Sequence, residues 1–303
     1  MPKISIVIPL YNKAPFIRTT IDSVLNQTYN DYEVVVVDDG STDNSVEVIK
    51  NYYTSDKIRI IQKENGGPSS ARNRGILEAK GEWVLLLDAD DILLPKALEI
   101  FDNKILGHPD IKYFVGNFYM MKSKDDIKIG SRRKYEGRVR YPFFFEASRN
   151  LTETSGTAIF ANSILQEELF DEKLRRYEDA ERQYRLMAKY PIYMFYEPVS
   201  IINREAASAS RPRKDIAEDF IGHLDFRNKS YWEQVALYLL ALEGKSIYPQ
   251  DVYALYGDIL KKRKIYYSIG IIIIRLYNGI QKLYYNIFRD NHNYKFDDLL
   301  RKK

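Results

Sequence analysis

Cysteine is absent from this 303-residue sequence, and histidine occurs only three times. The absence of cysteine excludes disulfides and thiolate metal sites and is typical of a reducing compartment, so we expect a cytoplasmic protein. His108, His223 and His292 are too scattered to suggest a metal site. The longest uncharged run of the tail, residues 265–274, ends at Arg275 and is too short to cross a bilayer. The N-terminus enters a strand pattern directly, and we expect no signal peptide.

Charge is distributed unevenly along the chain. Hydrophobic residues make up 45% of the sequence and charged residues 29%, which indicates a sizeable core. The formal charge is +4, but residues 261–303 contain eleven Lys or Arg and three Asp, so a basic tail follows a mildly acidic body. This pattern favours an anionic surface as partner over nucleic acid. We therefore expect peripheral contact of residues 261–303 with the inner face of a membrane. The alternative is a helical cap that buries its apolar stripe on the body.

Short apolar runs alternate with amphipathic segments over the first hundred residues. The spacing predicts strands at 4–8, 33–38, 57–62 and 82–88 and helices at 14–27, 41–53 and 67–81. Near-continuous apolar strands between helices predict a mostly parallel sheet with helices on both faces, an α/β fold. Further along, we predict a strand or strand pair near 111–122, a strand leading into a helix at 155–165, a helix at 177–190, a strand near 192–204, and mainly helices over 215–245 and 251–289.

Polar clusters follow each of the first four strands. They read "PLYN", "DDGSTD", "KENGGPSSARN" and "DADD". Right-handed crossovers bring the carboxyl ends of parallel strands to one edge of the sheet, which is where such sheets bind ligands. The sequence therefore predicts one crevice lined by all four clusters.

Each cluster also has a structural interpretation. Asp38 and Asp39 could belong to a turn, with Ser41 or Thr42 capping the next helix. The adjacent glycines of the third cluster match neither a dinucleotide fingerprint nor a P-loop. The three aspartates of "DADD" repel one another unless exposure or a cation relieves them, so Mg²⁺ or Mn²⁺ is the functional reading, and Asp91 as a helix cap is the alternative. The acidic residues of "YEDAE" could be a general base or a favourable first helical turn.

Taken together and in this order, the motifs resemble family 2 glycosyltransferases with the GT-A fold. The matching segments are "SIVIPLYN", "VVVVDDGSTD", "NGGPSSARNRG", "LLLDADD", "YEDAERQYRL" and "NREAASAS". The resemblance covers residues 3–210, so we predict a nucleotide-sugar-binding and catalytic domain at 1–210 and a helical extension at 211–303. The last motif lacks the histidine often found there in the family, which leaves a third metal or diphosphate contact open.

The resemblance implies a role for each matching residue. The implied substrate-binding residues are Pro9, Tyr11, Asp39, Gly67, Arg72, Asp88, Ala89 and Glu178. Among them, Tyr11 would flank the base, Asp39 would accept the base imide hydrogen, and Asp88 would hold the ribose. Asp90 would coordinate Mn²⁺ or Mg²⁺, with Asp91 as a helper. Asp179 would be the catalytic base, with Glu178 as its alternative.

The expected reaction is inverting transfer of a sugar from a UDP-sugar to a saccharide or lipid-linked acceptor, in the assembly of a surface polysaccharide or glycolipid. A carboxylate would remove the acceptor proton, and the metal would stabilise the leaving diphosphate. Two alternatives remain. A nucleotidyltransferase would be expected to carry a glycine-rich phosphate loop where this chain reads "PLYNKAP". A catalytically idle nucleotide-sugar-binding module is disfavoured by the acidic pair of "YEDAE".

Overall fold

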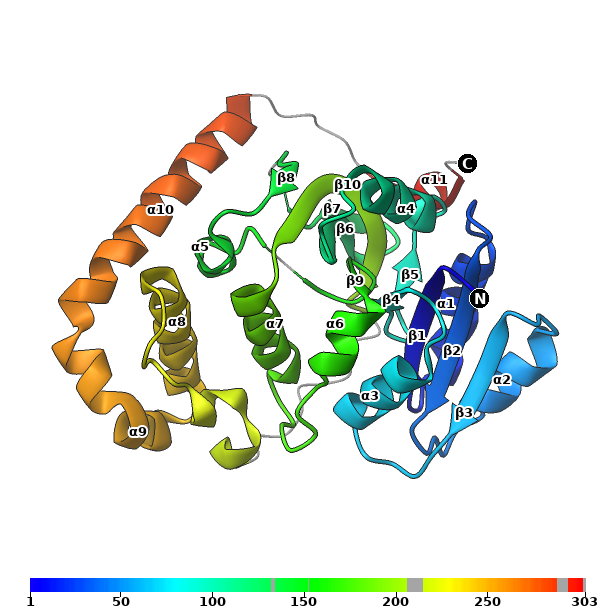
Figure 1. Ribbon diagram of the computed structural model, residues 1–303, viewed down its shortest axis with the longest axis horizontal. Helices are drawn as coiled ribbons and strands as arrows, with labels where there is room; N and C mark the ends of the chain where they lie inside the picture. Colours follow the sequence, from blue (N-terminus) through cyan, green and yellow to red (C-terminus); the bar gives the residue numbers. More distant parts are fainter. Residues whose placement is uncertain (132–133, 152, 206–214, 288–293, 302–303) are drawn as a thin grey trace.

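A computed structural model of the chain describes residues 1–131, 134–151, 153–205, 215–287 and 294–301. Its first hundred residues alternate strands and helices as predicted (Figure 1). These elements are β1 (Ile4–Leu10), α1 (Ala14–Leu25), β2 (Tyr32–Asp38), α2 (Ser45–Tyr52), β3 (Ile58–Gln62), α3 (Pro68–Glu78), β4 (Trp83–Leu86), β5 (Ile92–Leu93) and α4 (Ala97–Gly107).

The middle of the chain adds longer strands and returns to the same sheet. Its elements are β6 (Tyr113–Ser123), β7 (Asp126–Ile129), β8 (Gly137–Arg138), α5 (Pro142–Ala147), β9 (Ala158–Ala161), α6 (Asn162–Glu167), α7 (Glu178–Lys189) and β10 (Ile192–Asn203). These bounds confirm the strands predicted near 111–122 and 192–204, the strand leading into a helix predicted at 155–165, and the helix predicted at 177–190.

Ten strands in the described residues form a single sheet with the order β3-β2-β1-β4-β9-β6-β10-β5, with β7 paired to β6 and β8 to β10. The pairs β1–β2, β2–β3, β1–β4 and β6–β10 are parallel, whereas β9 runs antiparallel between β4 and β6. The sheet is therefore mostly parallel where the polar clusters lie. The register places Leu10 of β1 opposite Asp38 of β2, so both strands end at the same edge.

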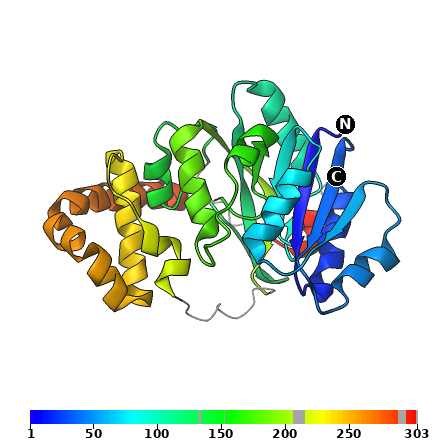
Figure 2. The same cartoon turned by 60° about the horizontal axis from the view of Figure 1, so that its bottom comes forward.

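Helices cover both faces of the sheet, which is why the central strands are apolar on both sides (Figures 1 and 2). Ile6, Ile8 and Val36 belong to one buried cluster with α1 and α4, while Val7 and Val37 belong to another with α3, α6 and α7. Helix α3 packs tightly on β1, because a Cβ on Gly75 would lie 2.2 Å from Cγ1 of Val7. The predicted α/β architecture is confirmed.

The C-terminal part is helical. It consists of the short 3₁₀ helices η1 (Ile216–Glu218) and η2 (Phe220–His223), the helices α8 (Tyr231–Ile247), α9 (Pro249–Lys262) and α10 (Lys264–Ile287), and α11 (Phe296–Arg301). Helices α8, α9 and α10 share a buried cluster of their own, whereas α11 packs beside β6 and β7 through Leu299. In the described part of the chain, no helix combines the length and the apolar character needed to cross a membrane.

One local prediction is wrong. We expected Ser41 or Thr42 to cap the second helix, but α2 begins after Asn44 and has no side-chain cap. The Ser41 hydroxyl instead accepts a hydrogen bond from the backbone N–H of Asn12, at 3.1 Å. The polar segment after β2 therefore binds the loop after β1 rather than closing its own helix.

Candidate functional site

A cavity of about 970 Å³ opens at the carboxyl ends of β1, β2 and β4. Its lining includes ten residues for which the sequence implied a role: Pro9, Tyr11, Asp39, Gly67, Arg72, Asp88, Ala89, Asp90, Asp91 and Asp179. Residues from five separate motifs thus meet in one place: four motifs follow parallel strands that end together, as expected, and the fifth contributes Asp179 from helix α7. The volume lies within the range of pockets that bind small organic ligands.

The loop after β1 presents Tyr11 to the cavity and is held by Asn12. Asn12 adopts a left-handed conformation with a φ of 51°. Its side-chain oxygen accepts hydrogen bonds from the backbone N–H groups of Thr42, at 2.8 Å, and Asp43, at 3.3 Å. The loops after β1 and β2 are therefore fastened together, and Tyr11 is left with about half of its surface exposed at the cavity.

Asp39 is buried and organises the glycine loop. One carboxylate oxygen accepts hydrogen bonds from the N–H of Gly66, at 2.9 Å, and from the ammonium of Lys63, at 2.6 Å. The other accepts from the N–H of Gly67, at 2.8 Å. A carboxylate offers about four acceptor positions, so these bonds leave room for about one more. Asp39 thus shapes the cavity wall whether or not it also contacts a ligand.

Gly67 is required by the backbone at the start of α3. Its φ is +91°, and a Cβ added there would lie 2.3 Å from Nη1 of Arg175. That guanidinium donates a hydrogen bond to the carbonyl of Gly66, at 2.9 Å. The glycine loop is therefore clamped between Asp39 on one side and Arg175 on the other. This explains the adjacent glycines without a dinucleotide or P-loop pattern.

Arg72 links the end of β4 to the start of α7. Its guanidinium donates a hydrogen bond to Oδ1 of Asp88, at 3.0 Å, and lies 3.5 Å from Oε1 of Glu178. It also lies over the ring of Phe170, at 5.3 Å from the centroid. Burial lowers the pKa of Arg72, but the nearby Asp88, Glu178 and Asp179 raise it above its ordinary value overall. The arginine stays charged and holds Asp88 at the cavity.

Glu178 and Asp179 diverge at the first turn of α7. Glu178 is buried beneath Arg72 and is not part of the cavity lining, whereas Asp179 is exposed and lines the cavity. The preceding residue, Tyr177, is the N-cap of α7 and has a left-handed backbone conformation with a φ of 55°. The predicted acidic first turn is confirmed, and it directs one carboxylate inward and one toward the cavity.

The aspartates after β4 have distinct surroundings. Asp90 lies 2.5 Å from the ammonium of Lys13, which reaches it from the loop after β1. Asp91 is buried and accepts a hydrogen bond from the backbone N–H of Asn203 at the end of β10, at 2.8 Å. The helix-cap interpretation of Asp91 is wrong, because β5 follows it and α4 begins after Lys96 without a side-chain cap.

Negative charge accumulates at this point of the cavity. Burial raises the pKa of Asp90, and Lys13 offsets part of that rise. Burial and the neighbouring Asp88 raise the pKa of Asp91 well above its ordinary value. Over the described residues, no group of three or more His, Asp or Glu side chains is placed to hold a metal ion by itself. Mg²⁺ is usually bound by one or two carboxylates together with substrate phosphates, and Asp88 and Asp90 at the cavity fit that arrangement.

Sequence reasoning missed the wall that the C-terminal part contributes. Asp215, Glu218, Asp219 and Tyr248 all line the cavity. Residues 215–219 are positioned by backbone pairing with the segment before α7, including a bond from the N–H of Arg175 to the carbonyl of Glu218, at 2.6 Å, whereas Tyr248 lies between α8 and α9. No motif marks these positions, and the pairing spans some forty residues of sequence. Residues 206–210 of the last predicted motif lie outside the described residues.

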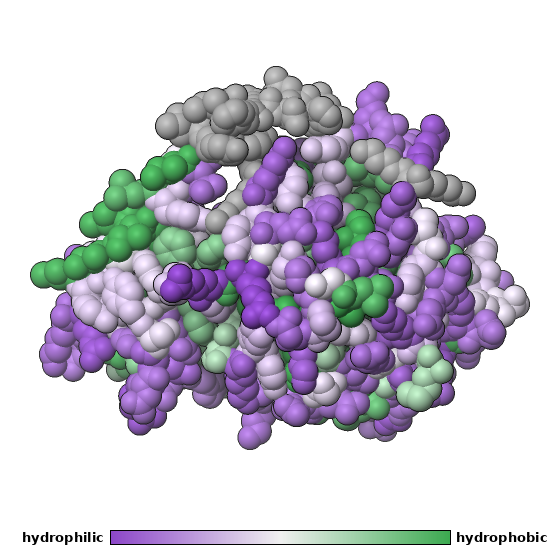
Figure 3. Space-filling model, turned by 45° about the horizontal axis from the view of Figure 1, so that its top comes forward, coloured by the Kyte–Doolittle hydropathy of each residue, from purple (hydrophilic) through white to green (hydrophobic). Residues whose placement is uncertain are grey.

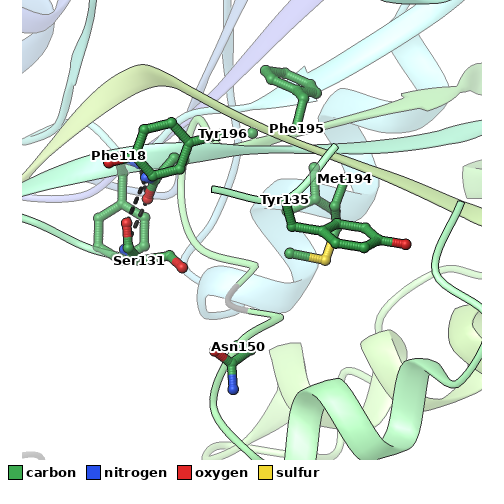
Figure 4. A pocket seen from close by; sticks show the side chains of 10 residues that line it. Phe118, Ser131, Tyr135, Asn150, Met194, Phe195 and Tyr196 are labelled. Atoms are coloured by element: carbon green, nitrogen blue, oxygen red, sulfur yellow. Dashed lines mark hydrogen bonds between the residues drawn. The ribbon is translucent and has the colours of Figure 1, made fainter. Parts of the chain in front are cut away.

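A second hollow lies between β6 and β10 (Figure 4). It measures about 10 Å³ and is lined in part by Tyr135, Asn150 and Met194. The side-chain amide of Asn117 donates to the carbonyl of Ser131 and accepts from its N–H, both at 2.8 Å. Such a space holds at most about one water molecule, so it is not a substrate site.

Comparison with known sequences finds glycosyltransferases. The family model described as glycosyl transferase family 2 matches residues 5–174. An uncharacterized glycosyltransferase of Rickettsia bellii (strain RML369-C) is 31% identical over 182 residues, which are 58% of this chain and 25% of the relative. Chondroitin synthase of Pasteurella multocida (strain Pm70) is 48% identical over 101 residues, 33% of this chain and 10% of that protein. The matched parts are thus a minor share of both relatives.

Solved structures show the same fold. The crystal structure of residues 1–349 of S. aureus TarS in complex with UDP superimposes with a TM-score of 0.61, at 22% identity, over 84% of this chain and 75% of that one. The predicted GT-A fold, with its mostly parallel sheet and C-terminal helices, is confirmed. Since the family model covers more than half of the residues, the chain belongs to glycosyl transferase family 2.

Proposed function

We propose that this protein transfers a sugar, with inversion, from a UDP-sugar to a hydroxyl of a saccharide or lipid-linked saccharide. The observation that carries the proposal is the meeting of Tyr11, Arg72, Asp88, Asp90 and Asp179 in one cavity at the carboxyl edge of the sheet. Family membership supports sugar transfer. A role in surface polysaccharide or glycolipid assembly is supported by the matched chondroitin synthase. A cytoplasmic location is supported by the absence of cysteine.

The donor would bind along the strand ends. An exposed aromatic ring at the cavity, Tyr11, offers a surface on which a base can stack. Asp88 is held by Arg72 and half-exposed, so one carboxylate oxygen is available to a ribose hydroxyl. TarS structures in complex with UDP and with UDP-GlcNAc support a uridine nucleotide as the ligand. Asp39 fixes the shape of this wall through Gly66 and Gly67.

Asp179 would act as the general base. Its carboxylate lies at the cavity on α7, a different element from the carboxylates that follow β4. An acceptor hydroxyl between the donor sugar and Asp179 would lose its proton to this carboxylate as it attacks the anomeric carbon. The bond to the diphosphate breaks on the opposite side, which inverts the centre in one displacement. Glu178 is committed to Arg72, which favours Asp179 over Glu178 for this role.

A divalent cation, Mg²⁺ or Mn²⁺, would supply positive charge that stabilises the departing diphosphate. Asp90 would hold it, and Asp88 is the neighbouring carboxylate at the cavity. Lys13 neutralises Asp90 at 2.5 Å, and its ammonium lies at the cavity as well. It would therefore turn from Asp90 toward the donor phosphates once Asp90 binds the cation.

Replacing Asp179 with Asn tests the base assignment. A thermal-shift screen of nucleotide sugars with and without Mn²⁺ first identifies the donor, because a bound ligand raises the melting temperature. We expect Asp179→Asn to lower transfer about a thousandfold, since a general base contributes about 10²- to 10⁴-fold, while donor affinity stays within about twofold. Glu181→Gln is the matched control, because Glu181 pairs with Arg185 at 2.6 Å on the same helix. Equal rates for Asp179→Asn and wild type would refute the assignment, and donor binding without turnover by wild type would indicate an idle binding module.

Isosteric changes at Asp90 and Asp91 test the metal assignment. Asp90→Asn should abolish the gain in donor affinity that Mn²⁺ produces, measured by calorimetry with and without the ion. Asp91→Asn should leave most of that gain, because its carboxylate is buried against Asn203. Equal losses from both substitutions would show that the roles of Asp90 and Asp91 have been assigned wrongly.

A further inference from the structure

Helix α10 exposes a continuous row of large aliphatic side chains. Six of its residues, between 42% and 82% exposed, form what we name the α10 stripe: Ile265, Ile269, Ile272, Ile273, Leu276 and Ile280. They recur at intervals of three and four residues and so share one face of the helix. Figure 3 shows hydrophobic side chains gathered along this helix at the edge of the molecule. Contiguous exposed apolar surface of this kind marks an interaction site.

The opposite face of α10 is fastened to the rest of the protein. Tyr267 is fully buried, and its hydroxyl donates to Oε1 of Gln234 on α8, at 3.0 Å. Ile274 is also buried in the cluster that α8 and α9 share with this helix. Asn278 accepts a hydrogen bond from Asn150, at 3.1 Å, which ties the helix to the segment after α5. The packed face fixes the rotation of α10, so the stripe points outward and is not a core face.

Charge on α10 has one sign only. Residues 264–287 contain no Asp or Glu. Lys264, Arg275 and Lys282 are exposed, and their spacings of two and three helical turns place them along one flank of the stripe. Tyr266, about half exposed, lies on the other flank. An apolar face between a basic flank and an aromatic one is typical of helices that lie in a membrane interface.

We propose that the α10 stripe docks this protein on an anionic lipid surface, with α10 lying in the plane of the interface. The aliphatic side chains would enter the boundary between headgroups and acyl chains, while Lys264, Arg275 and Lys282 would pair with lipid phosphates. A second copy of the chain fits less well, because another α10 would bring more positive charge and no carboxylate to offset it. The inference concerns where the protein resides and does not depend on its reaction.

The apolar contribution is tested by vesicle flotation of the full chain. Leu276→Ser/Ile280→Ser removes two side chains that are 63% and 66% exposed. Binding to vesicles that contain phosphatidylglycerol should fall at least about tenfold, because each buried CH₂ contributes to partitioning. The matched control is Leu77→Ser/Leu106→Ser, which removes side chains that are 58% and 65% exposed on α3 and α4. The control should bind like wild type, and equal losses from both pairs would overturn the proposal.

The basic flank is tested with the lipid charge varied. Lys264→Gln/Arg275→Gln/Lys282→Gln should weaken binding to phosphatidylglycerol vesicles about a hundredfold and leave binding to pure phosphatidylcholine unchanged. Failure of wild type to bind anionic vesicles would overturn the proposal, whether or not the protein binds UDP-sugars. A wild-type dimer that Leu276→Ser/Ile280→Ser converts to a monomer, measured by light scattering, would show that a second copy covers the stripe instead.

Discussion

Two parts of the chain line the same cavity, but only one of them can be recognised from motifs in the sequence. The strand ends of residues 4–91 supply the Tyr11 loop, the Asp39 turn, the glycine loop and the aspartates after β4. The C-terminal residues 215–219 and Tyr248 form another wall without any recognisable motif. The first part places its side chains by strand topology, whereas the second places them by packing of irregular segments.

This difference has a physical cause. Consecutive parallel strands must end at one edge of the sheet, so any polar residue after a strand is positioned before tertiary detail matters. A 3₁₀ helix such as η1 has no comparable constraint. Its place beside the cavity depends on long-range backbone bonds, such as the one from Arg175 to the carbonyl of Glu218. Strand ends can therefore be predicted from local patterns, and the C-terminal wall cannot.

Replacing Arg72 would break the first part most severely. In Arg72→Met, Glu178 loses its cation while it stays buried, and Asp88 loses the donor that holds it. Removing one member of a buried ion pair costs about 3–5 kcal/mol. Because Asp88 is about 40% exposed, we expect about 3 kcal/mol in the free energy of unfolding and weaker donor binding. Urea denaturation and calorimetry measure the two effects.

Arg74 is a matched control for Arg72. It lies on the same helix but is exposed, and it pairs with Glu78 one turn away, at 2.8 Å. Exposed pairs contribute well under about 1 kcal/mol, so Arg74→Met should be nearly neutral. Equal destabilisation by the two substitutions would mean that Arg72 is not the link between β4 and α7.

Much of the first part was predictable from the sequence. Strand positions follow from apolar runs, and the meeting of Asp88, Asp90 and Asp179 follows from topology and the family resemblance. The hydrogen-bond and ion-pair partners of these residues could not be predicted from the sequence. Lys13 reaches Asp90, and Asn203 holds Asp91, across separations that leave no local periodicity. Side-chain pairing between loops depends on the final geometry, which a linear pattern does not encode.

Gly67→Ala tests the clamp on the glycine loop, and it should destabilise the protein less than Arg72→Met does. The substitution meets a φ of +91° and places a Cβ 2.3 Å from Nη1 of Arg175. Backbone strain at such positions costs about 1–3 kcal/mol. We expect the free energy of unfolding to fall by about 2 kcal/mol and donor binding to weaken, because the loop and Arg175 must both shift. Gly107→Ala is the control, since no atom lies within 4 Å of its added Cβ. Its unfolding curve should match that of wild type, and a similar loss in both would remove the argument for the clamp.

Glu146 lies on α5, and its titration responds to Glu153 and to Asp179, the carboxylate that α7 presents to the cavity. Burial raises the pKa of Glu146 to about 8, with further rises from Glu153 and Asp179 and a small opposing effect of Arg149. The folded protein therefore holds this proton more tightly than the unfolded chain, whose carboxyl titrates near 4.5. Folding stability that depends on the proton is complete below about pH 4.5 and is lost as the pH rises toward 8.

Glu146→Gln should remove this slope. Between pH 6 and pH 8, we expect wild type to lose about 2 kcal/mol more free energy of unfolding than the variant, measured by urea denaturation at each pH. Glu47→Gln changes an exposed side chain on α2 and should keep the wild-type slope. A variant with the same pH dependence as wild type would place Glu146 in contact with water. In that case water separates Glu146 from Asp179, and α5 does not shield the side of α7 that carries the proposed base.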